Sequence, residues 1–253
     1  MSSFILKMIA VISMTIDHFN KIIGQFGLQC LFPALTTDTS YLLCQMMDRI
    51  GRLAFPIFAF LIAEGARKTR SMPRYIVRLT LLAVISEPVF FFAFNWRMNP
   101  GWTDWMHNLS RLNWNNVFVT HLLGTSAIYA CQMIEKKYAK LRCWGAVPGL
   151  LLSMFAAGYV GSDYGAMGVL LIVALYLVRK NAHKVAVIVL WSLGMYMYQL
   201  SVFNLMLSTF SAASAILICG YNGKRGIPVK WAFYFYYPVH LMILLLCNKL
   251  IYS

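Results

Sequence analysis

Long runs of apolar residues follow one another along almost the whole chain and constrain its fold more than any other feature. A helix needs about 20 mostly apolar residues to cross roughly 30 Å of hydrocarbon. About nine segments approach this requirement, at residues 4–23, 42–64, 75–95, 117–134, 144–160, 164–178, 185–203, 205–221 and 231–251. We therefore expect an all-α, polytopic transmembrane bundle of about nine spans, forming a single integral membrane domain over residues 1–253.

The composition agrees with a membrane protein and weakens the case for a nucleic acid partner. Hydrophobic residues make up 60% of the chain and charged residues only 12%, which is too apolar for a soluble domain of this length. The net charge of +14 would suggest nucleic acid binding in a soluble protein. In a membrane protein, loops on the cytoplasmic side collect Lys and Arg as topology signals. We expect a lipid bilayer and no nucleic acid as the partner.

The basic residues cluster after every second predicted span. The clusters are Arg67, Lys68, Arg70, Arg74 and Arg78; Lys136, Lys137, Lys140 and Arg142; Arg179, Lys180 and Lys184; and Lys224, Arg225 and Lys230. This alternation predicts a cytoplasmic N-terminus and an outer C-terminus in a bacterial cytoplasmic (inner) membrane. The outer loop at 95–116 carries four tryptophans. It is expected to lie at the headgroup level, either as an aromatic belt or as a lid over substrate.

The six cysteines show neither CxxC nor Cys/His ligand spacing, which argues against a metal site and a redox motif. We expect no metal. Cys30 and Cys44 both fall on the outer side, where an oxidising compartment would allow a disulfide. The sequence leaves this pairing open.

Ionisable side chains inside predicted spans are the strongest functional candidates, because they are costly in hydrocarbon and face a bundle interior or cavity. They include Asp17, His18, Arg49, Arg52, Glu87, His121 and His240. At a rise of about 1.5 Å per residue, most lie in the middle or outer half of the membrane. This asymmetry predicts a cavity that opens outward.

Helix geometry limits which of these groups can meet. Asp17 and His18 are adjacent, so their side chains point about 100° apart and Asp17 cannot orient His18 from the same face. Asp17 faces Lys21 one turn on, and Asp48 faces Arg52 in the same way. For both acids, an internal salt bridge that lowers the cost of insertion is the alternative to a catalytic role.

Arg49 and Arg52 are three residues apart on one helix face and can hold one anion between them. Three prolines, each near a polar residue, interrupt predicted spans: Pro56, Pro88 and Pro238. A proline bends a helix and frees a backbone carbonyl, and broken membrane helices are tolerated where they line a cavity. Kinks and polar groups therefore indicate one internal site.

Six motifs extend along the chain from the first predicted span to the last. They are IDH ending at His18, DRIGRLAFPIFAFLIAEG at 48–65, SEPVF at 86–90, NNVFVTHLLG at 115–124, GSDYGAMGVLLI at 161–172 and FYFYYPVHLMIL at 233–244. In combination they resemble the TraX family, which is similar to a branch of the membrane acyltransferase-3 group and is associated with N-terminal acetylation of conjugative pilin subunits. The resemblance implies an acetyl-CoA-dependent N-acetyltransferase whose acceptor is the N-terminal amine of a pilin or another exported peptide.

In the wider group, as the resemblance implies, a first-helix His and an Arg-x-x-Arg pair serve acyl transfer, and His18, Arg49 and Arg52 match them. An imidazole with an unperturbed pKa of about 6.5 suits a general base at neutral pH. The candidate catalytic residues are His18, Asp17, Arg52, His240 and Glu87. The candidate acetyl-CoA-binding residues are Arg49, Arg52, Asn116, Arg67 and Arg70. The candidate substrate-binding residues are His121, Asp163 and Tyr164.

Arg52 or Asn116 can stabilise the thioester oxyanion, and His240 and Glu87 can position the acceptor amine or relay its proton. Direct transfer and transfer through an acetyl-histidine intermediate both fit these residues. The alternatives are an acyltransferase that acts on a sugar or lipid headgroup, a small proton-coupled transporter, and an assembly or scaffolding membrane protein.

Overall fold

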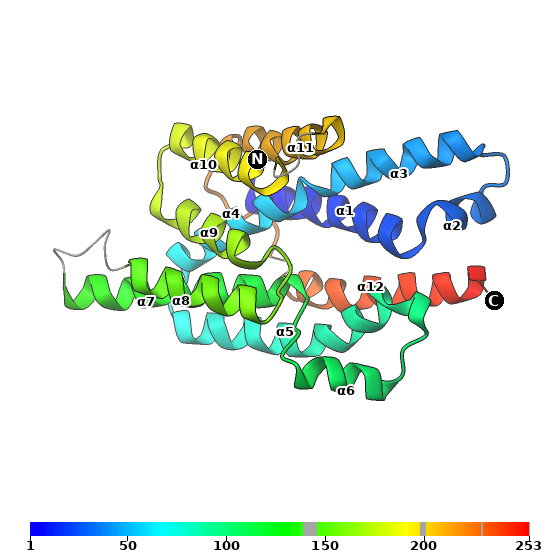
Figure 1. Cartoon of the computed structure of the whole chain (residues 1–253). Helices are drawn as coiled ribbons and strands as arrows, with labels where there is room; N and C mark the ends of the chain where they lie inside the picture. The colour runs from blue at the N-terminus through cyan, green and yellow to red at the C-terminus, as the bar shows by residue number, and fades with distance from the viewer. Residues whose placement is uncertain (139–145, 198–200, 229, 253) are drawn as a thin grey trace. The chain divides into compact units, whose positions relative to one another are not determined.

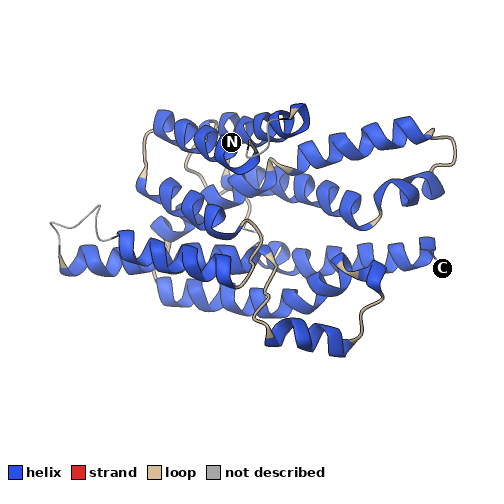
Figure 2. Cartoon of the chain, viewed as in Figure 1, coloured by secondary structure: helices blue, strands red, loops and turns tan. Residues whose placement is uncertain are grey.

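The computed structural model describes residues 1–138, 146–197, 201–228 and 230–252, and every regular element in these ranges is helical (Figures 1 and 2). The helices are α1 (Ser3–Ile22), α2 (Gly24–Leu31), α3 (Thr37–Gly51), α4 (Ala54–Lys68), α5 (Met72–Phe94), η1 (Trp96–Met98), α6 (Trp102–Ser110), α7 (Val117–Lys137), α8 (Ala146–Tyr159), α9 (Gly165–Leu177), α10 (Asn181–Tyr196), α11 (Val202–Cys219) and α12 (Lys230–Tyr252). The all-α prediction is confirmed. Lys140 and Arg142 of the predicted basic loop lie outside the described residues.

The chain forms two compact units, which are described separately. The first unit contains residues 1–58, 89–100 and 188–253, and the second contains residues 59–88 and 101–187. The assignment of a single membrane domain to residues 1–253 stays a prediction.

Four helices of the described chain are long and apolar enough to cross a membrane: α5, α7, α11 and α12, the last over Ala232–Tyr252. They correspond to the predicted spans at 75–95, 117–134, 205–221 and 231–251. The apolar helices α8 and α9 have 14 and 13 residues, short of the roughly 20 that cross a bilayer. The chain therefore has the helices of a membrane protein, while the count of nine spans and the cytoplasmic N-terminus stay predictions.

The span predicted at 42–64 is two helices, α3 and α4, and the interruption that the sequence placed at Pro56 lies at residues 52 and 53 instead. At the break, the N–H groups of Arg52 and Leu53 donate to the carbonyls of Arg49 and Ile50, three residues earlier and each at 3.1 Å. This tightened turn ends α3. Pro56 falls in the first turn of α4, where backbone N–H groups have no partner within the helix and a missing N–H costs little. Pro88 and Pro238 do lie inside helices, in α5 and α12.

The first unit is built around α1, which packs against α2, α3 and α12, while α11 packs against α3. Leu6, Ala10 and Met14 recur every fourth residue on the buried face of α1, the spacing that keeps side chains on one side of a helix. Ser13 Oγ donates to the carbonyl of Ile50, and Asn20 Nδ2 donates to that of Cys44 at 3.0 Å. The chain therefore holds α1 and α3 together with polar bonds as well as apolar contacts.

In the second unit, α7, α8 and α9 pack against one another. Gly124 of α7 lies against Ile172 of α9, so closely that a Cβ would stand 2.8 Å from the Ile172 side chain. The helix α6 has no buried residue, and Trp102 at its start is 65% exposed. This exposure suits the surface position predicted for the tryptophan-rich segment.

Cys30 and Cys44 are both free thiols in this structure. The disulfide that the sequence allowed between them is therefore not formed here.

Candidate functional site

The centre of the first unit contains a pair of hydrogen-bonded histidines. His18 Nδ1 of α1 and His240 Nε2 of α12 are 2.8 Å apart although 222 residues separate them in sequence. Both side chains are buried, with 8% and 5% of their surfaces exposed, and their ring planes differ by 7°. The structure therefore brings together two of the predicted catalytic residues.

The second ring nitrogen of His240 fixes the proton arrangement of the pair. His240 Nδ1 lies 2.9 Å from the carbonyl oxygen of Tyr236, and a carbonyl can only accept, so Nδ1 carries the proton. In the neutral ring, Nε2 is then an acceptor, and His18 Nδ1 must donate to it. This assignment leaves the lone pair of His18 on Nε2, where it can take a proton from a bound molecule.

Aromatic side chains enclose the histidine pair. Phe94 and Tyr237 meet the His18 ring edge-on, with centroids 5.4 and 6.0 Å away. Tyr236 stacks on His240 at 5.0 Å, and the Tyr236 hydroxyl lies 2.7 Å from Thr15 Oγ1 on α1. These walls hold both rings in place and keep the pair away from bulk water.

Asp17 forms a separate ionic cluster beside the pair. Its carboxylate lies 2.5 Å from Arg52 Nη2 and 2.7 Å from Lys21 Nζ. The predicted Asp17–Lys21 pair is confirmed. The predicted Asp48–Arg52 side-chain pair is wrong, because Arg52 turns toward Asp17 and its Nε donates to the backbone carbonyl of Asp48 instead.

The two arginines of the Arg-x-x-Arg pair have different partners. Arg52 stands over the Tyr196 ring at 6.0 Å, in addition to its ion pair with Asp17. Arg49 Nη2 donates to Gln45 Oε1 at 2.9 Å, and Nη1 lies 3.4 Å from Met46 Sδ. Over the described ranges, Arg49 has no carboxylate partner, so its positive charge remains uncompensated.

Glu87 and Asn116 lie in the second unit and are bonded to each other. Asn116 Nδ2 and its backbone N–H donate to Glu87, and Asn115 N–H donates to the same carboxylate at 3.1 Å. Asn116 Oδ1 in turn accepts from the Phe118 N–H at 2.9 Å and caps the N-terminus of α7. The side chains of Glu87 and Asn116 therefore attach the start of α7 to α5, the helix that contains Pro88.

The three predicted substrate-binding residues also belong to the second unit. His121 is 3% exposed and meets the Phe118 ring edge-on at 6.0 Å. The backbone carbonyl of Asp163 accepts from Thr120 Oγ1, while Tyr164 adopts a left-handed conformation (φ +60°) as the N-cap of α9. The loop before α9 is therefore attached to α7 close to His121.

Arg67 caps the end of a helix. Its Nη2 donates to the carbonyls of Leu175, Tyr176 and Val178 at the C-terminus of α9, and its Nη1 pairs with Glu64 at 2.6 Å. Arg70, the other predicted donor-binding residue of this loop, is exposed. Arg67 is thus engaged at a helix end, whereas the side chain of Arg70 is exposed.

Sequence reasoning missed three residues that build this site. The Tyr236 carbonyl sets the proton arrangement, Tyr196 supports Arg52, and Gly51 lets α3 approach α1 so closely that a Cβ would lie 2.5 Å from Asp17. Two of the three have a signal in the sequence: Gly51 begins the GRLAFP motif, and Tyr236 stands one turn before His240. Tyr196 stands in none of the quoted motifs. Among the described side chains, no cluster of three His, Cys, Asp or Glu is arranged to hold a metal ion.

Comparison with known proteins gives a family match over nearly the whole chain. The family model described as "TraX protein" matches residues 2–248. The "Probable fimbrial assembly protein FimC, serogroup H1" of Dichelobacter nodosus is 26% identical over 260 residues, covering 96% of this chain and 94% of that protein. No solved structure matches the chain.

Proposed function

The chain belongs to the TraX family, and from this premise we propose that it is a membrane-embedded acetyltransferase. It moves an acetyl group from acetyl-CoA to the N-terminal amine of an exported or membrane peptide such as a pilin subunit. The family match and the fimbrial assembly name of the Dichelobacter nodosus protein support a pilin-related acceptor. The four long apolar helices support a position in the bacterial inner membrane.

The histidine pair is the observation that carries this proposal. Acetylation of an amine needs a base that removes the amine proton as the new bond forms. His18 Nε2 carries a lone pair in the arrangement set by His240 and the Tyr236 carbonyl. His240 is a positioning residue in this scheme, because it holds His18 in the tautomer that leaves Nε2 unprotonated.

The proposed reaction is direct acyl transfer. The acceptor nitrogen forms a bond to the thioester carbon, and His18 Nε2 takes one proton from that nitrogen. The carbon–sulfur bond then breaks, and the proton passes from His18 to the departing sulfur. The products are an N-acetylated peptide and free CoA thiol, so atoms and electrons balance without a further reactant.

Arg52 is the proposed group that stabilises the developing oxyanion. A preorganised cation is worth more in a buried, water-poor site than in solution. Asp17 holds the guanidinium in place at 2.5 Å, and both side chains are largely buried, with 14% and 11% exposed. Asp17 thus acts through Arg52 and not through His18, as the helix geometry requires.

Arg49 is the proposed contact for the phosphates of acetyl-CoA. In the described part of the chain, the Arg49 side chain bonds only the neutral groups of Gln45 and Met46. A guanidinium without a carboxylate partner can bind a phosphate through two parallel hydrogen bonds.

The fimbrial assembly name of the relative favours a second candidate, an assembly protein without catalytic activity. One experiment separates the two. The purified protein in nanodiscs is incubated with labelled acetyl-CoA and a synthetic peptide carrying a pilin N-terminus. The release of CoA thiol and the peptide mass are then followed, with His18→Ala and the exposed control His183→Ala in parallel.

We expect the peptide to gain one acetyl group, and His18→Ala to lower the rate by about 10²- to 10⁴-fold, the usual contribution of a general base. His183→Ala should react like the unmodified protein. Full activity in His18→Ala would exclude His18 as the base. Failure of every protein to consume acetyl-CoA would favour the assembly protein.

A further inference from the structure

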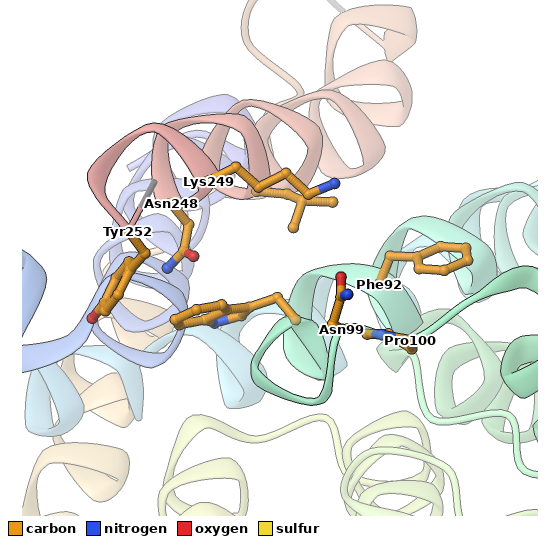
Figure 3. A pocket seen from close by; sticks show the side chains of 8 residues that line it. Phe92, Asn99, Pro100, Asn248, Lys249 and Tyr252 are labelled. Carbon is orange, nitrogen blue, oxygen red and sulfur yellow. The ribbon is translucent and has the colours of Figure 1, made fainter.

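A pocket of about 280 Å³ lies in the first unit, between the end of α5, the turn that follows it, and the last turns of α12 (Figure 3). Three of its eight lining residues are aromatic. Trp96 and Tyr252 pack against each other with ring centroids 4.6 Å apart and planes tilted by 50°, and Figure 3 shows Phe92 on the side away from Tyr252. Pockets of this size and lining bind apolar groups.

One buried polar atom in this pocket has no partner. Asn248 is fully buried, and its Nδ2 donates to the carbonyl of Ile22 at 2.5 Å. Its Oδ1 accepts no hydrogen bond from any described residue. A buried acceptor left unpaired is unfavourable, so this oxygen is suited to receive an N–H from a bound molecule.

Lys249 adds a positive charge to the same wall. In Figure 3 both side chains extend from α12, Asn248 downward and Lys249 to the right. Lys249 is exposed and forms no ion pair within the described chain. The pocket therefore offers the unpaired Asn248 oxygen, the amide of Asn99, one cation, and aromatic and aliphatic surface.

The pocket borders the contact between α12 and α1 that holds the histidine pair, because Asn248 lines the pocket and also bonds Ile22 of α1. His240 bonds His18, and Asn248 bonds Ile22, so both α12 residues face α1. Eight residues of helix separate His240 from Asn248, a distance of about 12 Å along the axis. An extended peptide covers about 3.3–3.6 Å per residue, so about four residues would span the two positions.

We propose that this pocket is the acceptor subsite of the enzyme and that it holds an apolar side chain at about the fourth residue of the acceptor peptide. Asn248 Oδ1 accepts a backbone N–H of that peptide, and Lys249 faces a peptide carbonyl or acidic side chain. The inference rests on the proposed function, which places the acceptor amine at His18.

The chemistry of the pocket favours a peptide over the other acceptor classes. A peptide presents an N–H donor next to an apolar side chain, as this lining requires. The phosphate oxygens of a phospholipid only accept hydrogen bonds and cannot pair with Asn248 Oδ1, so a lipid would need an amine or hydroxyl in its headgroup to satisfy this oxygen. A sugar needs several polar partners for its hydroxyls, whereas five of the eight lining residues are aromatic or aliphatic: Phe92, Trp96, Pro100, Leu245 and Tyr252.

The test fills the pocket and measures peptide binding without acetyl-CoA. Leu245 lines the pocket, and Leu245→Trp reduces its volume. Leu246→Trp introduces the same side chain one position on, where the leucine is 58% exposed and does not line the pocket. The probe is a fluorescein-labelled peptide of about eight residues, long enough to pass the pocket, with a free N-terminal amine and leucine at its fourth position.

We expect Leu245→Trp to weaken binding at least about tenfold and Leu246→Trp to change it by less than about twofold, as measured by fluorescence anisotropy. Serine at the fourth peptide position should weaken binding to the unmodified protein in a similar way. Equal thermal unfolding midpoints of the two variants show that folding is not responsible.

The remaining outcomes separate this inference from the proposed function. If Leu245→Trp weakens peptide binding but no acetyl group is transferred, the acetyltransferase proposal fails and the pocket stays a peptide site. If transfer occurs with the same KM for peptide in Leu245→Trp and in the unmodified protein, the pocket inference fails alone. Displacement of the peptide by short-chain phosphatidylglycerol would identify a lipid site and overturn it.

Discussion

His240 determines what His18 can do, because a histidine that must donate through Nδ1 can accept only through Nε2. The bond between the two rings and the bond from His240 to the Tyr236 carbonyl form a directed chain from α12 to α1. Asp17 has no part in this chain, since its oxygens bind Lys21 and Arg52. Asp17 and His18 are therefore adjacent on α1 but belong to two separate networks, one of ion pairs and one of hydrogen-bonded histidines.

Replacement of His240 tests this chain directly. His240→Leu removes the acceptor for His18 Nδ1 and is expected to lower kcat by about 10- to 100-fold, a usual effect of losing an outer hydrogen-bond partner. His240→Gln retains an acceptor oxygen and should recover part of the rate. Steady-state kinetics should show little change in KM for acetyl-CoA in either variant. Equal rates of the two variants would contradict the role of the hydrogen bond.

Gly51 is a second residue on which the site depends, and its replacement should be costly. An alanine Cβ would lie 2.5 Å from Asp17 Cβ and Oδ1, so Gly51→Ala must push α3 away from α1. We expect a loss of about 1–3 kcal/mol in the free energy of unfolding, as for other overpacked positions. Gly158→Ala on α8 is the matched control, because its Cβ would meet no atom within 4 Å.

Unfolding midpoints in one detergent compare the two glycine variants. Gly158→Ala should leave the midpoint unchanged or raise it, since alanine favours helix more than glycine by roughly 0.5–1 kcal/mol. A midpoint for Gly51→Ala as high as that of the control would mean that α3 and α1 do not depend on this close approach.

At the scale of elements, the interruption between α3 and α4 places Arg52 at a helix end. The sequence predicted one helix over 42–64 bent at Pro56, because an internal proline lacks the N–H of the helical ladder. In the structure, the ladder ends before the proline, so Pro56 begins a helix instead of bending one. Pro88 and Pro238 lie within long apolar helices that continue on either side, so the bends expected at these two prolines stay predictions.

The roles of Arg67, in the last turn of α4, and Arg70, in the turn after it, can be distinguished by replacing each with methionine. Arg67→Met leaves the carbonyls of Leu175 and Val178 without this donor and is expected to cost about 1–3 kcal/mol in unfolding free energy. Arg70→Met should leave stability unchanged, since Arg70 is exposed. If Arg70 binds the phosphates of acetyl-CoA, its loss raises the KM for acetyl-CoA. A raised KM with unchanged stability in Arg67→Met would show that Arg67 is the phosphate ligand.

At the scale of the whole molecule, the alternation of basic loops predicts the orientation in the membrane. Lysines and arginines on the cytoplasmic side set topology, which places the N-terminus inside and Ser253 outside. A reporter that is active only outside the cytoplasm, such as alkaline phosphatase, should be active when fused after residue 253 and inactive when fused before Met1. The reverse pattern would contradict both the predicted orientation and an outward-facing acceptor site.

Local sequence determined the helical character of this protein, its long apolar segments and its family, because helix periodicity, hydrophobic length and motifs are properties of neighbouring residues. It also supplied the candidates Asp17, His18, Arg52 and His240, since ionisable groups in apolar segments are conspicuous. Only the tertiary structure decided that His18 bonds His240, that Asp17 bonds Arg52, and that Asn248 leaves an oxygen unpaired in a pocket. These relations depend on the packing of helices distant in sequence, and no local pattern specifies which side chains such packing brings within bonding distance.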